Sequence, residues 1–203
     1  MSSSGIIVVG LMIFAVMITW RSGATAMRAR LEQEIETPEE FQAYLRRENI
    51  PRVPSTGIFL SRTGGPVPPI LSRHARQLHA IPSQMVSLST LFEEVPRVPE
   101  ERRLHVERVF EDFWHFEVRF GFLEVPSLRK VMQAARVQCT ELHLDKVTFF
   151  VAHDEVVRSA THPRLSWWRC KLFGFLYRNS VHVVDRYDLP GEDLVVIGRL
   201  ISL

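Results

Sequence analysis

The sequence predicts an α/β protein: one N-terminal transmembrane helix, then a cytosolic domain in which helices flank a mixed sheet. Two observations carry this prediction. All 25 Lys and Arg and all 23 Asp and Glu follow Trp20, so the first twenty residues hold no charged side chain. Beyond residue 55, short β-prone runs alternate with segments of helical periodicity, which is typical of an α/β sandwich.

The apolar segment runs from Gly5 to Trp20 with Thr19 as its one polar residue. As a helix it measures about 24 Å against a hydrocarbon core of about 30 Å, and Arg21 can extend it by reaching toward the headgroups. Trp20 and Arg21 are therefore predicted to mark the membrane interface, with residues 1–21 as the transmembrane helix.

Basic residues follow this segment at Arg21, Arg28 and Arg30, whereas none precedes it. The positive-inside rule then places the remaining chain in the cytoplasm, as a single-pass protein of the cell membrane. A cleaved signal peptide and a buried soluble helix are the alternatives. This segment lacks the basic start and the small-residue cleavage site that a signal peptide needs. A buried helix of a soluble protein is rarely so uniformly apolar.

Residues 22–54 are predicted to form an amphipathic stem, a helix and a linker. The membrane helix continues into a polar, helix-favouring stretch over residues 21–36. A second helix begins at the N-cap Thr37, followed by Pro38, and is amphipathic. The stretch NIPRVPST, residues 49–56, is expected to be a proline-broken linker.

Residues 55–203 are predicted to form the cytosolic α/β domain. The two runs in the middle of this region favour a hairpin, because apolar side chains alternate along the second of them. The expected strands cover residues 56–62, 85–92, 103–112, 113–122, 146–154 and 193–203, and the expected helices cover residues 69–81, 126–138 and 163–179.

The sequence holds no familiar catalytic motif, so no enzyme, cofactor or metal site is predicted. His74 and His79 are five residues apart, which puts them on different faces of a helix. His115 alternates with apolar neighbours and is expected to face solvent. Cys139 and Cys170 form no ligand pair, so free thiols in a reducing compartment are expected, with Cys170 in the core.

Two further groups of side chains receive structural interpretations. The charged run Glu100 to Arg103 is expected to be a solvated face, with a specific anion or partner site as the alternative. The aromatic and apolar residues near the C-terminus are expected to form the buried face of a helix. They are Trp167, Trp168, Phe173, Phe175 and Leu176. A net charge of +2 without a basic patch argues against nucleic acid as a partner.

Several stretches, read together, resemble the C-terminal part of bacterial KUP/HAK/KT potassium uptake proteins, and the resemblance extends over essentially the whole chain. The stretches are MITWRSG, IPRVPSTGIFLSR, GGPVPPIL, EVPRVPEERRLHVERV, FEVRFGFLEVPSL, WWRCKLFGFLYRN and LVVIGRLISL. The resemblance implies potassium import by proton symport. It places the ion path in earlier membrane helices that have no counterpart in these 203 residues, so no ion ligand is assigned here.

The chain is therefore expected to be a transporter fragment, whether from a truncated gene, a split partner or an internally assigned start. Its expected partners are the lipid bilayer and either the remaining transporter core or a homodimer mate, with potassium reached only through that core. A single-span binding module for a nucleotide or a partner membrane protein is the alternative. A membrane-tethered enzyme is a more distant one.

The resemblance also directs attention to charged residues beside turns, as a regulatory or structural motif. These residues are Arg97, Glu101, Arg102, Arg103, Arg119 and Glu124. The structural interpretation is that Arg119 and Glu124 brace the turn after Gly121.

Overall fold

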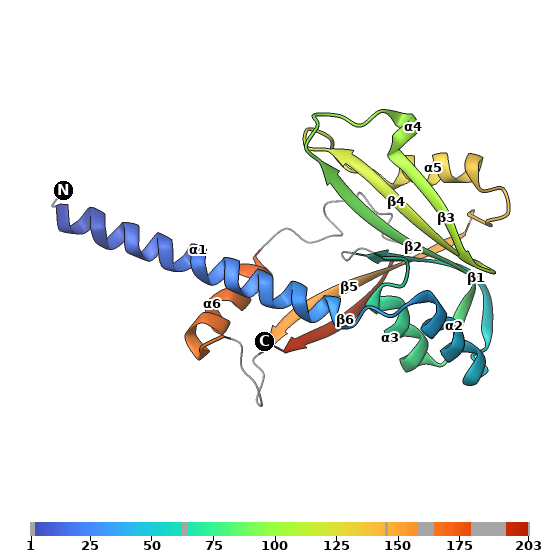
Figure 1. Cartoon of the computed structure of the whole chain (residues 1–203), viewed down its shortest axis with the longest axis horizontal. Coiled ribbons are helices and arrows are strands. Elements are labelled where there is room, and N and C mark those ends of the chain that lie inside the picture. Colours follow the sequence, from blue (N-terminus) through green and yellow to red (C-terminus); the bar gives the residue numbers. More distant parts are fainter. Residues whose placement is uncertain (1–2, 62–64, 145, 158–164, 180–193, 203) are drawn as a thin grey trace. The chain divides into compact units, whose positions relative to one another are not determined.

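The computed structural model describes residues 3–61, 65–144, 146–157, 165–179 and 194–202 (Figure 1). These residues form two compact units. The helical unit consists of the described parts of residues 1–33, 153–180 and 198–203. The sheet unit consists of the described parts of residues 34–152 and 181–197.

The elements alternate as the sequence predicts. The helices are α1 (Ser3–Glu32), α2 (Pro38–Arg47), α3 (Pro69–Leu78), α4 (Glu100–Arg103), α5 (Leu128–Gln138) and α6 (Trp167–Arg178). The strands are β1 (Arg52–Ser61), β2 (Ile81–Glu93), β3 (Leu104–Phe110), β4 (Phe113–Gly121), β5 (Val147–Val157) and β6 (Leu194–Ser202). The short helix α4 lies in the charged run for which the sequence analysis expects no helix.

The strands form a mixed sheet in the order β3-β4-β2-β1-β5-β6. The central pairs β2–β4, β1–β2 and β1–β5 are parallel, whereas β3 and β4 pair antiparallel. The predicted hairpin and the predicted mixed sheet are both confirmed.

Alternate residues of the strands serve two separate cores, because helices cover both faces of the sheet (Figure 1). Ile58, Val86 and Phe116 point into a core that is closed by α5. Phe59 and Met85 point into a second core that is closed by α2 and α3. Burial of alternate residues on opposite faces is the geometry that period-two sequences produce.

Helix α2 begins as the sequence predicts. Thr37 is the N-cap, its Oγ1 accepts a bond from the Glu40 N–H at 3.2 Å, and the Glu40 carboxylate accepts from the Thr37 N–H at 3.1 Å. This reciprocal capping box satisfies two backbone donors that a helix start otherwise leaves unpaired. Phe41 and its helical neighbours are then buried against the sheet.

Strand β1 begins at Arg52, inside the stretch predicted to be a linker, so the linker prediction is wrong for residues 52–55. Its pairing with β2 shifts register between Val53 and Thr56, on either side of Pro54. Proline has no N–H for the ladder, and an irregular register accommodates it. The domain boundaries 1–21, 22–54 and 55–203 stay a prediction.

His115 was predicted to face solvent, and this prediction is wrong. The residue is buried, with 7% of its surface exposed. Its Nδ1 lies 2.8 Å from Ser87 Oγ and its Nε2 lies 3.3 Å from Ser89 Oγ. Burial lowers the pKa of His115. A polar side chain can occupy the apolar sheet here because both ring nitrogens reach hydroxyl partners on β2.

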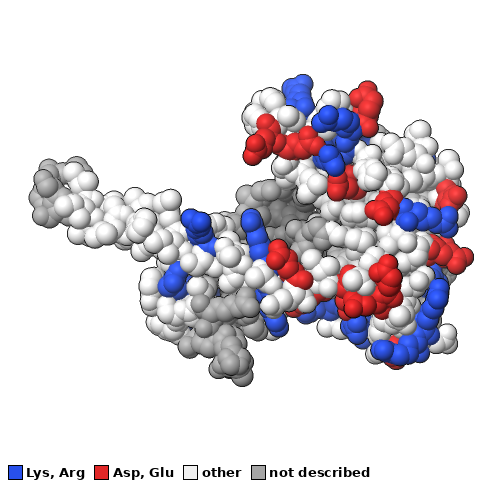
Figure 2. All heavy atoms as spheres, in the orientation of Figure 1, with Lys and Arg blue, Asp and Glu red and all other residues white. Residues whose placement is uncertain are grey.

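The helical unit contains α1, the one helix in the described residues that is long and apolar enough to cross a membrane, over Gly5–Glu32. Figure 2 shows no charged side chain on its outer part. The predicted continuation past the apolar segment is confirmed, since α1 runs unbroken to Glu32. Met27 and Leu31, in the C-terminal half of α1, share a buried cluster with Phe173 of α6.

Only part of the predicted aromatic face of α6 is buried. Phe173 is fully buried and Cys170 is a buried free thiol, the latter as predicted. Trp167, Trp168 and Phe175 are 58%, 52% and 58% exposed, so the prediction that they form a buried face is wrong. Apolar side chains on a helix show that it avoids water, and they do not specify protein as the surroundings.

Candidate functional site: an arginine–glutamate pair beside a pocket

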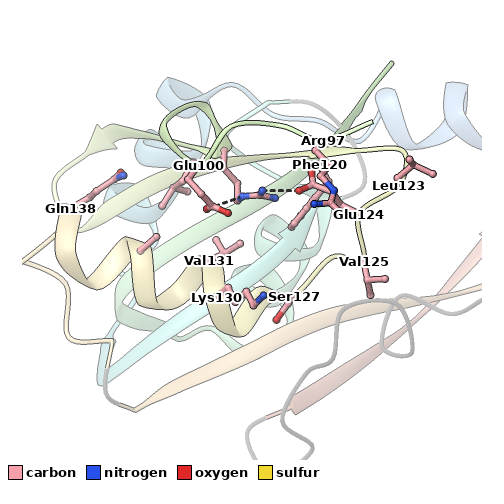
Figure 3. Close-up of a pocket in the computed structure, with 13 residues that line it drawn as sticks. Arg97, Glu100, Phe120, Leu123, Glu124, Val125, Ser127, Lys130, Val131 and Gln138 are labelled. Atoms are coloured by element: carbon pink, nitrogen blue, oxygen red, sulfur yellow. Dashed lines mark hydrogen bonds and ion pairs between the residues drawn. The ribbon is translucent and has the colours of Figure 1, made fainter. Parts of the chain in front are cut away.

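A pocket of about 350 Å³ lies in the sheet unit where β4 turns toward α5 (Figure 3). Arg97 and Glu100 line it from the segment that precedes β3, and Lys130 and Val131 line it from α5. Phe120, near the end of β4, contributes an aromatic wall.

The turn after β4 brings the chain unusually close to the segment before α4. A Cβ atom on Gly121 would overlap the carbonyl group of Pro96. The Phe122 N–H donates to Val95 O at 3.0 Å, and the Leu123 N–H donates to Pro96 O at 3.2 Å. Glycine at position 121 is therefore what allows the two backbones to meet.

An ion pair joins these two segments. Arg103 Nη2 donates to Glu124 Oε1 at 2.7 Å, and both side chains are 14% exposed. The carboxylate of Glu124 also accepts from the Gly121 N–H at 2.7 Å and from the Val98 N–H at 3.2 Å. Arg103 in turn donates to Val98 O and to Glu100, both at 3.0 Å, so the pair is held from several sides.

The electrostatics of the pair follow from these contacts. The hydrogen bond from Arg103, followed by that from the Gly121 N–H, lowers the pKa of Glu124 to about 2. The hydrogen bond to Glu124 raises the pKa of Arg103. The Arg103 guanidinium also lies 5.5 Å from the centroid of the Phe120 ring. Both charges are therefore fixed across the physiological pH range.

The sequence-predicted motif residues fall into two groups. Arg97, Arg103 and Glu124 meet at the pocket. Arg119 lies elsewhere on β4, where it pairs with Glu117 at 2.7 Å and with Glu93 at 3.2 Å. Glu124 thus accepts a bond within the turn after Gly121, whereas Arg119 bonds along the strands. The regulatory or structural role of the motif stays a prediction.

The remaining charged residues are distributed between these groups and solvent. Arg102 approaches Glu93 at 3.5 Å, and Glu101 is exposed. Arg103 is inward-facing, so the expectation of a fully solvated charged run is wrong for this residue. The reason is its partner Glu124, which lies 21 residues further along the chain.

The predicted interface residues lie on α1. The Trp20 ring lies 5.5 Å from the Phe173 ring of α6. Arg21 is the first charged residue of the helix. Their place at a membrane interface stays a prediction.

Lys130 is a pocket residue that the sequence analysis did not single out, whereas Glu100 entered there as part of the charged run with an anion or partner site as the alternative. Lys130 belongs to the face of α5 that also carries Ala134 and Gln138, all of which line the pocket. The i, i+4, i+8 spacing of these residues is a signal for one shared face, yet they differ in polarity and so gave no apolar stripe.

Chemically, the pocket offers positive charge beside apolar walls. Neither Arg97 nor Lys130 forms an ion pair within the described residues, whereas Arg103 is neutralised by carboxylates. Such a site suits a small anion with an apolar or aromatic part. Within the described ranges, no three His, Cys, Asp or Glu side chains gather as metal ligands would.

Comparison with known proteins gives consistent matches. The family described as K+ potassium transporter C-terminal domain matches residues 54–203. The chain is 40% identical over 194 residues to "Probable potassium transport system protein Kup 4" of Bradyrhizobium sp. strain BTAi1, covering 96% of this chain and 30% of the relative. No solved structure gives a significant match.

Two further relatives carry similar names. The chain is 32% identical to "Probable potassium transport system protein Kup 2" of Paramagnetospirillum magneticum, covering 97% of this chain and 31% of the relative. It is 30% identical to "Probable potassium transport system protein Kup 1" of Bradyrhizobium sp. strain ORS 278, covering 94% and 31%. The chain thus spans a little under one third of the length of these relatives. It belongs to the KUP family of potassium transporters, whose C-terminal domain it carries.

Proposed function

We propose that this chain is the membrane-tethered, cytosolic C-terminal part of a potassium uptake system, and that it regulates or supports transport through a core supplied by other membrane helices. The observation that carries the proposal is α1, whose segment Gly5–Trp20 contains no charged side chain, followed by a domain of the potassium transporter family. One apolar span without a carboxylate offers no ligands for a cation path.

The orientation follows from charge. Arg21, Arg28 and Arg30 flank the apolar segment on its C-terminal side only, which favours a cytosolic location for the domain. Proton symport enters the proposal through the family, and the pathway for both ions is assigned to the core. No enzymatic activity is proposed.

Expression in a cell that lacks potassium uptake tests whether the ion path lies outside this chain. The chain alone is expected not to restore growth at low potassium, because it holds no ion path. A chimera of the Bradyrhizobium strain BTAi1 relative, with this chain in place of its matching segment, is expected to restore growth. Rescue by the chain alone would contradict the assignment of the ion path to other helices.

The same chimera tests the role of the domain. The relative without its matching segment is expected to reach the membrane yet to take up rubidium more slowly than the chimera. Equal uptake by both proteins would rule out a supporting role. Symport predicts that an inward proton gradient accelerates uptake by the chimera and that a protonophore removes the acceleration.

A second candidate function is a single-span binding module that senses a nucleotide. The pocket favours it, because Arg97 and Lys130 present positive charge beside Phe120 and form no ion pair with the residues that the structure describes. Nucleotides, cyclic dinucleotides included, are expected to raise the melting temperature of the full chain in detergent. The double substitution Arg97→Gln with Lys130→Gln should remove the rise, and Arg129→Gln should keep it. A flat response to every nucleotide would count against sensing.

A further inference from the structure

Helix α6 presents an aromatic surface that nothing in the described chain covers. Trp167, Trp168 and Phe175 are each more than half exposed and share one side of the helix. Three large aromatic rings on a single helix form an apolar patch of the kind that marks an interaction surface.

The opposite side of α6 packs against α1 near residues 20–23. Arg169 Nη2 donates to Ser22 Oγ at 2.8 Å, and the Phe173 ring lies 5.5 Å from the Trp20 ring. A Cβ on Gly23 would overlap the Phe173 ring, so the helices are in close contact here. These contacts fall where the uncharged part of α1 ends.

The charge of α6 matches a particular kind of surface. Its charged residues are Arg169, Lys171 and Arg178, and it contains no acidic residue. Lys171 Nζ lies 4.3 Å from the centroid of the Trp167 ring, so ammonium and aromatic ring are presented together. Arg178 pairs with Glu155 at 3.9 Å, and both side chains are more than half exposed.

We infer that α6 is an interfacial helix that lies on the lipid bilayer, in the headgroup region of the leaflet that α1 leaves. Trp and Tyr favour that depth because their rings are apolar with one polar atom, and basic side chains pair there with anionic headgroups. Attachment to α1 at Ser22 holds α6 at the same depth as Trp20. This inference rests on the proposed function in one respect, namely that α1 enters the membrane.

The length of the apolar segment supports the same placement. Gly5–Trp20 gives about 24 Å of helix, less than the roughly 30 Å of a hydrocarbon core. A short span brings its flanking residues down to the headgroups, and with them whatever is packed against Trp20. The aromatic rings of α6 then replace water contact by lipid contact.

The test uses the full chain in vesicles of phosphatidylcholine and phosphatidylglycerol, with bromine atoms on the acyl chains near the headgroups. Three variants keep one tryptophan each, at position 20, 114 or 168, with the other three changed to Phe. Bromine quenches nearby indole, so Trp168 should lose fluorescence to the same extent as Trp20. Trp114, buried in the sheet unit, is the control that should stay bright.

The outcomes separate the inference from the proposed function. If Trp20 is quenched and Trp168 stays as bright as Trp114, the inference is overturned and the membrane anchor is intact. A protein neighbour that shields α6 from lipid, such as a second copy of the chain, would give this result. Quenching of neither Trp20 nor Trp168 would overturn both. Quenching of Trp168 alone would support lipid contact by α6 and contradict the anchor.

Two further measurements serve as controls for charge and for folding. In the Trp168 variant, Lys171→Glu with Arg178→Glu should reduce quenching in anionic vesicles, because the headgroups then repel α6. If the tryptophan substitutions disturb folding, the native chain labelled with 5-fluorotryptophan repeats the comparison. A paramagnetic headgroup label should then broaden three of its four resonances and leave that of Trp114 sharp.

Discussion

At the scale of single residues, the charges of Arg103 and Glu124 are tightly constrained. Each is mostly buried, and each is held by backbone groups of the neighbouring turn as well as by the other. A carboxylate with two backbone donors and a guanidinium is far more stable ionised than protonated. The pair, with its bonds to Val98, therefore links α4 and the segment before it to the segment before α5, and both side chains line the pocket.

Acid should weaken this connection. The folded-state pKa of Glu124 is about 2, below its ordinary value of 4.5, so its stabilisation is complete above pH 4.5 and is lost as the pH falls toward 2. Glu124→Gln should lower the free energy of unfolding at pH 7 by about 2 kcal/mol, since a charged hydrogen-bond partner is lost. It should also flatten the decline between pH 5 and pH 3. Urea titrations measure both effects, and Glu101→Gln, at an exposed position, is the control.

The turn that carries Glu124 depends on Gly121. Gly121→Ala places a methyl group against the Pro96 carbonyl and should lower the free energy of unfolding by about 1–3 kcal/mol. Gly198→Ala has open space around its Cβ and should leave stability nearly unchanged. Thermal unfolding of the two variants distinguishes them, and equal melting temperatures would contradict the close approach.

At the scale of elements, the contact between α1 and α6 depends on shape more than on charge. Gly23 leaves room for the Phe173 ring, and Trp20 packs beside it. Gly10 lies on the same helix with open space around it, so α1 has one glycine that serves the contact and one that does not.

Filling the space at Gly23 should therefore loosen α6. Gly23→Leu is expected to accelerate tryptic cleavage within α6, at Arg169, Lys171 and Arg178, because a detached helix unfolds locally more often. Gly10→Leu is the matched control on the same helix. Unchanged cleavage in Gly23→Leu would show that the ring of Phe173 is not held by α1.

The strands of the helical unit contain a buried ion pair of their own. Arg199 on β6 donates to Asp154 on β5 at 2.7 Å, and their side chains are 6% and 0% exposed. Asp154→Asn removes the carboxylate charge that faces the buried Arg199 guanidinium and should lower the free energy of unfolding by about 3 kcal/mol. A chemical-denaturation series with the single variants and Asp154→Asn combined with Arg199→Gln measures the coupling, which vanishes if the pair contributes nothing.

At the scale of the whole molecule, the proposed attachment to lipid depends on the uncharged segment Gly5–Trp20 of α1. Phe14 lies in the middle of that helix and is 59% exposed. Phe14→Arg should oppose insertion by about 3 kcal/mol, whereas Phe14→Leu should be neutral. Alkaline carbonate extraction of membranes is expected to release the first variant and retain the second. Retention of both would indicate that other parts of the chain hold it on the membrane.

Patterns within one element predicted much of this molecule. Period-two alternation around Phe116 predicted β4, and Thr37 predicted the start of α2. Partners distant in sequence could not be read in the same way. His115 was assigned to solvent because its hydroxyl partners, Ser87 and Ser89, lie on another strand. Arg103 was predicted to lie on a solvated face because its partner Glu124 is separated from it in sequence by the whole β3–β4 hairpin.

The aromatic residues of α6 show a different limit. The pattern of Trp167 and Trp168 indicates that these side chains avoid water, and burial in protein and contact with lipid satisfy that requirement equally. The packing of α6 beside Trp20 is visible only in the three-dimensional structure, and the inference that the aromatic face contacts lipid depends on it.

The two helices of the helical unit also differ in when they are made. Ribosomes add about 5–20 residues per second, so α1 leaves the ribosome on the order of ten seconds before α6. Throughout that interval Phe173 and the rest of α6 do not yet exist, and the first apolar surroundings that α1 can meet are those of the translocation machinery and the bilayer. For the proposed membrane anchor, the order of synthesis thus favours insertion of α1 first and packing of α6 against it afterwards.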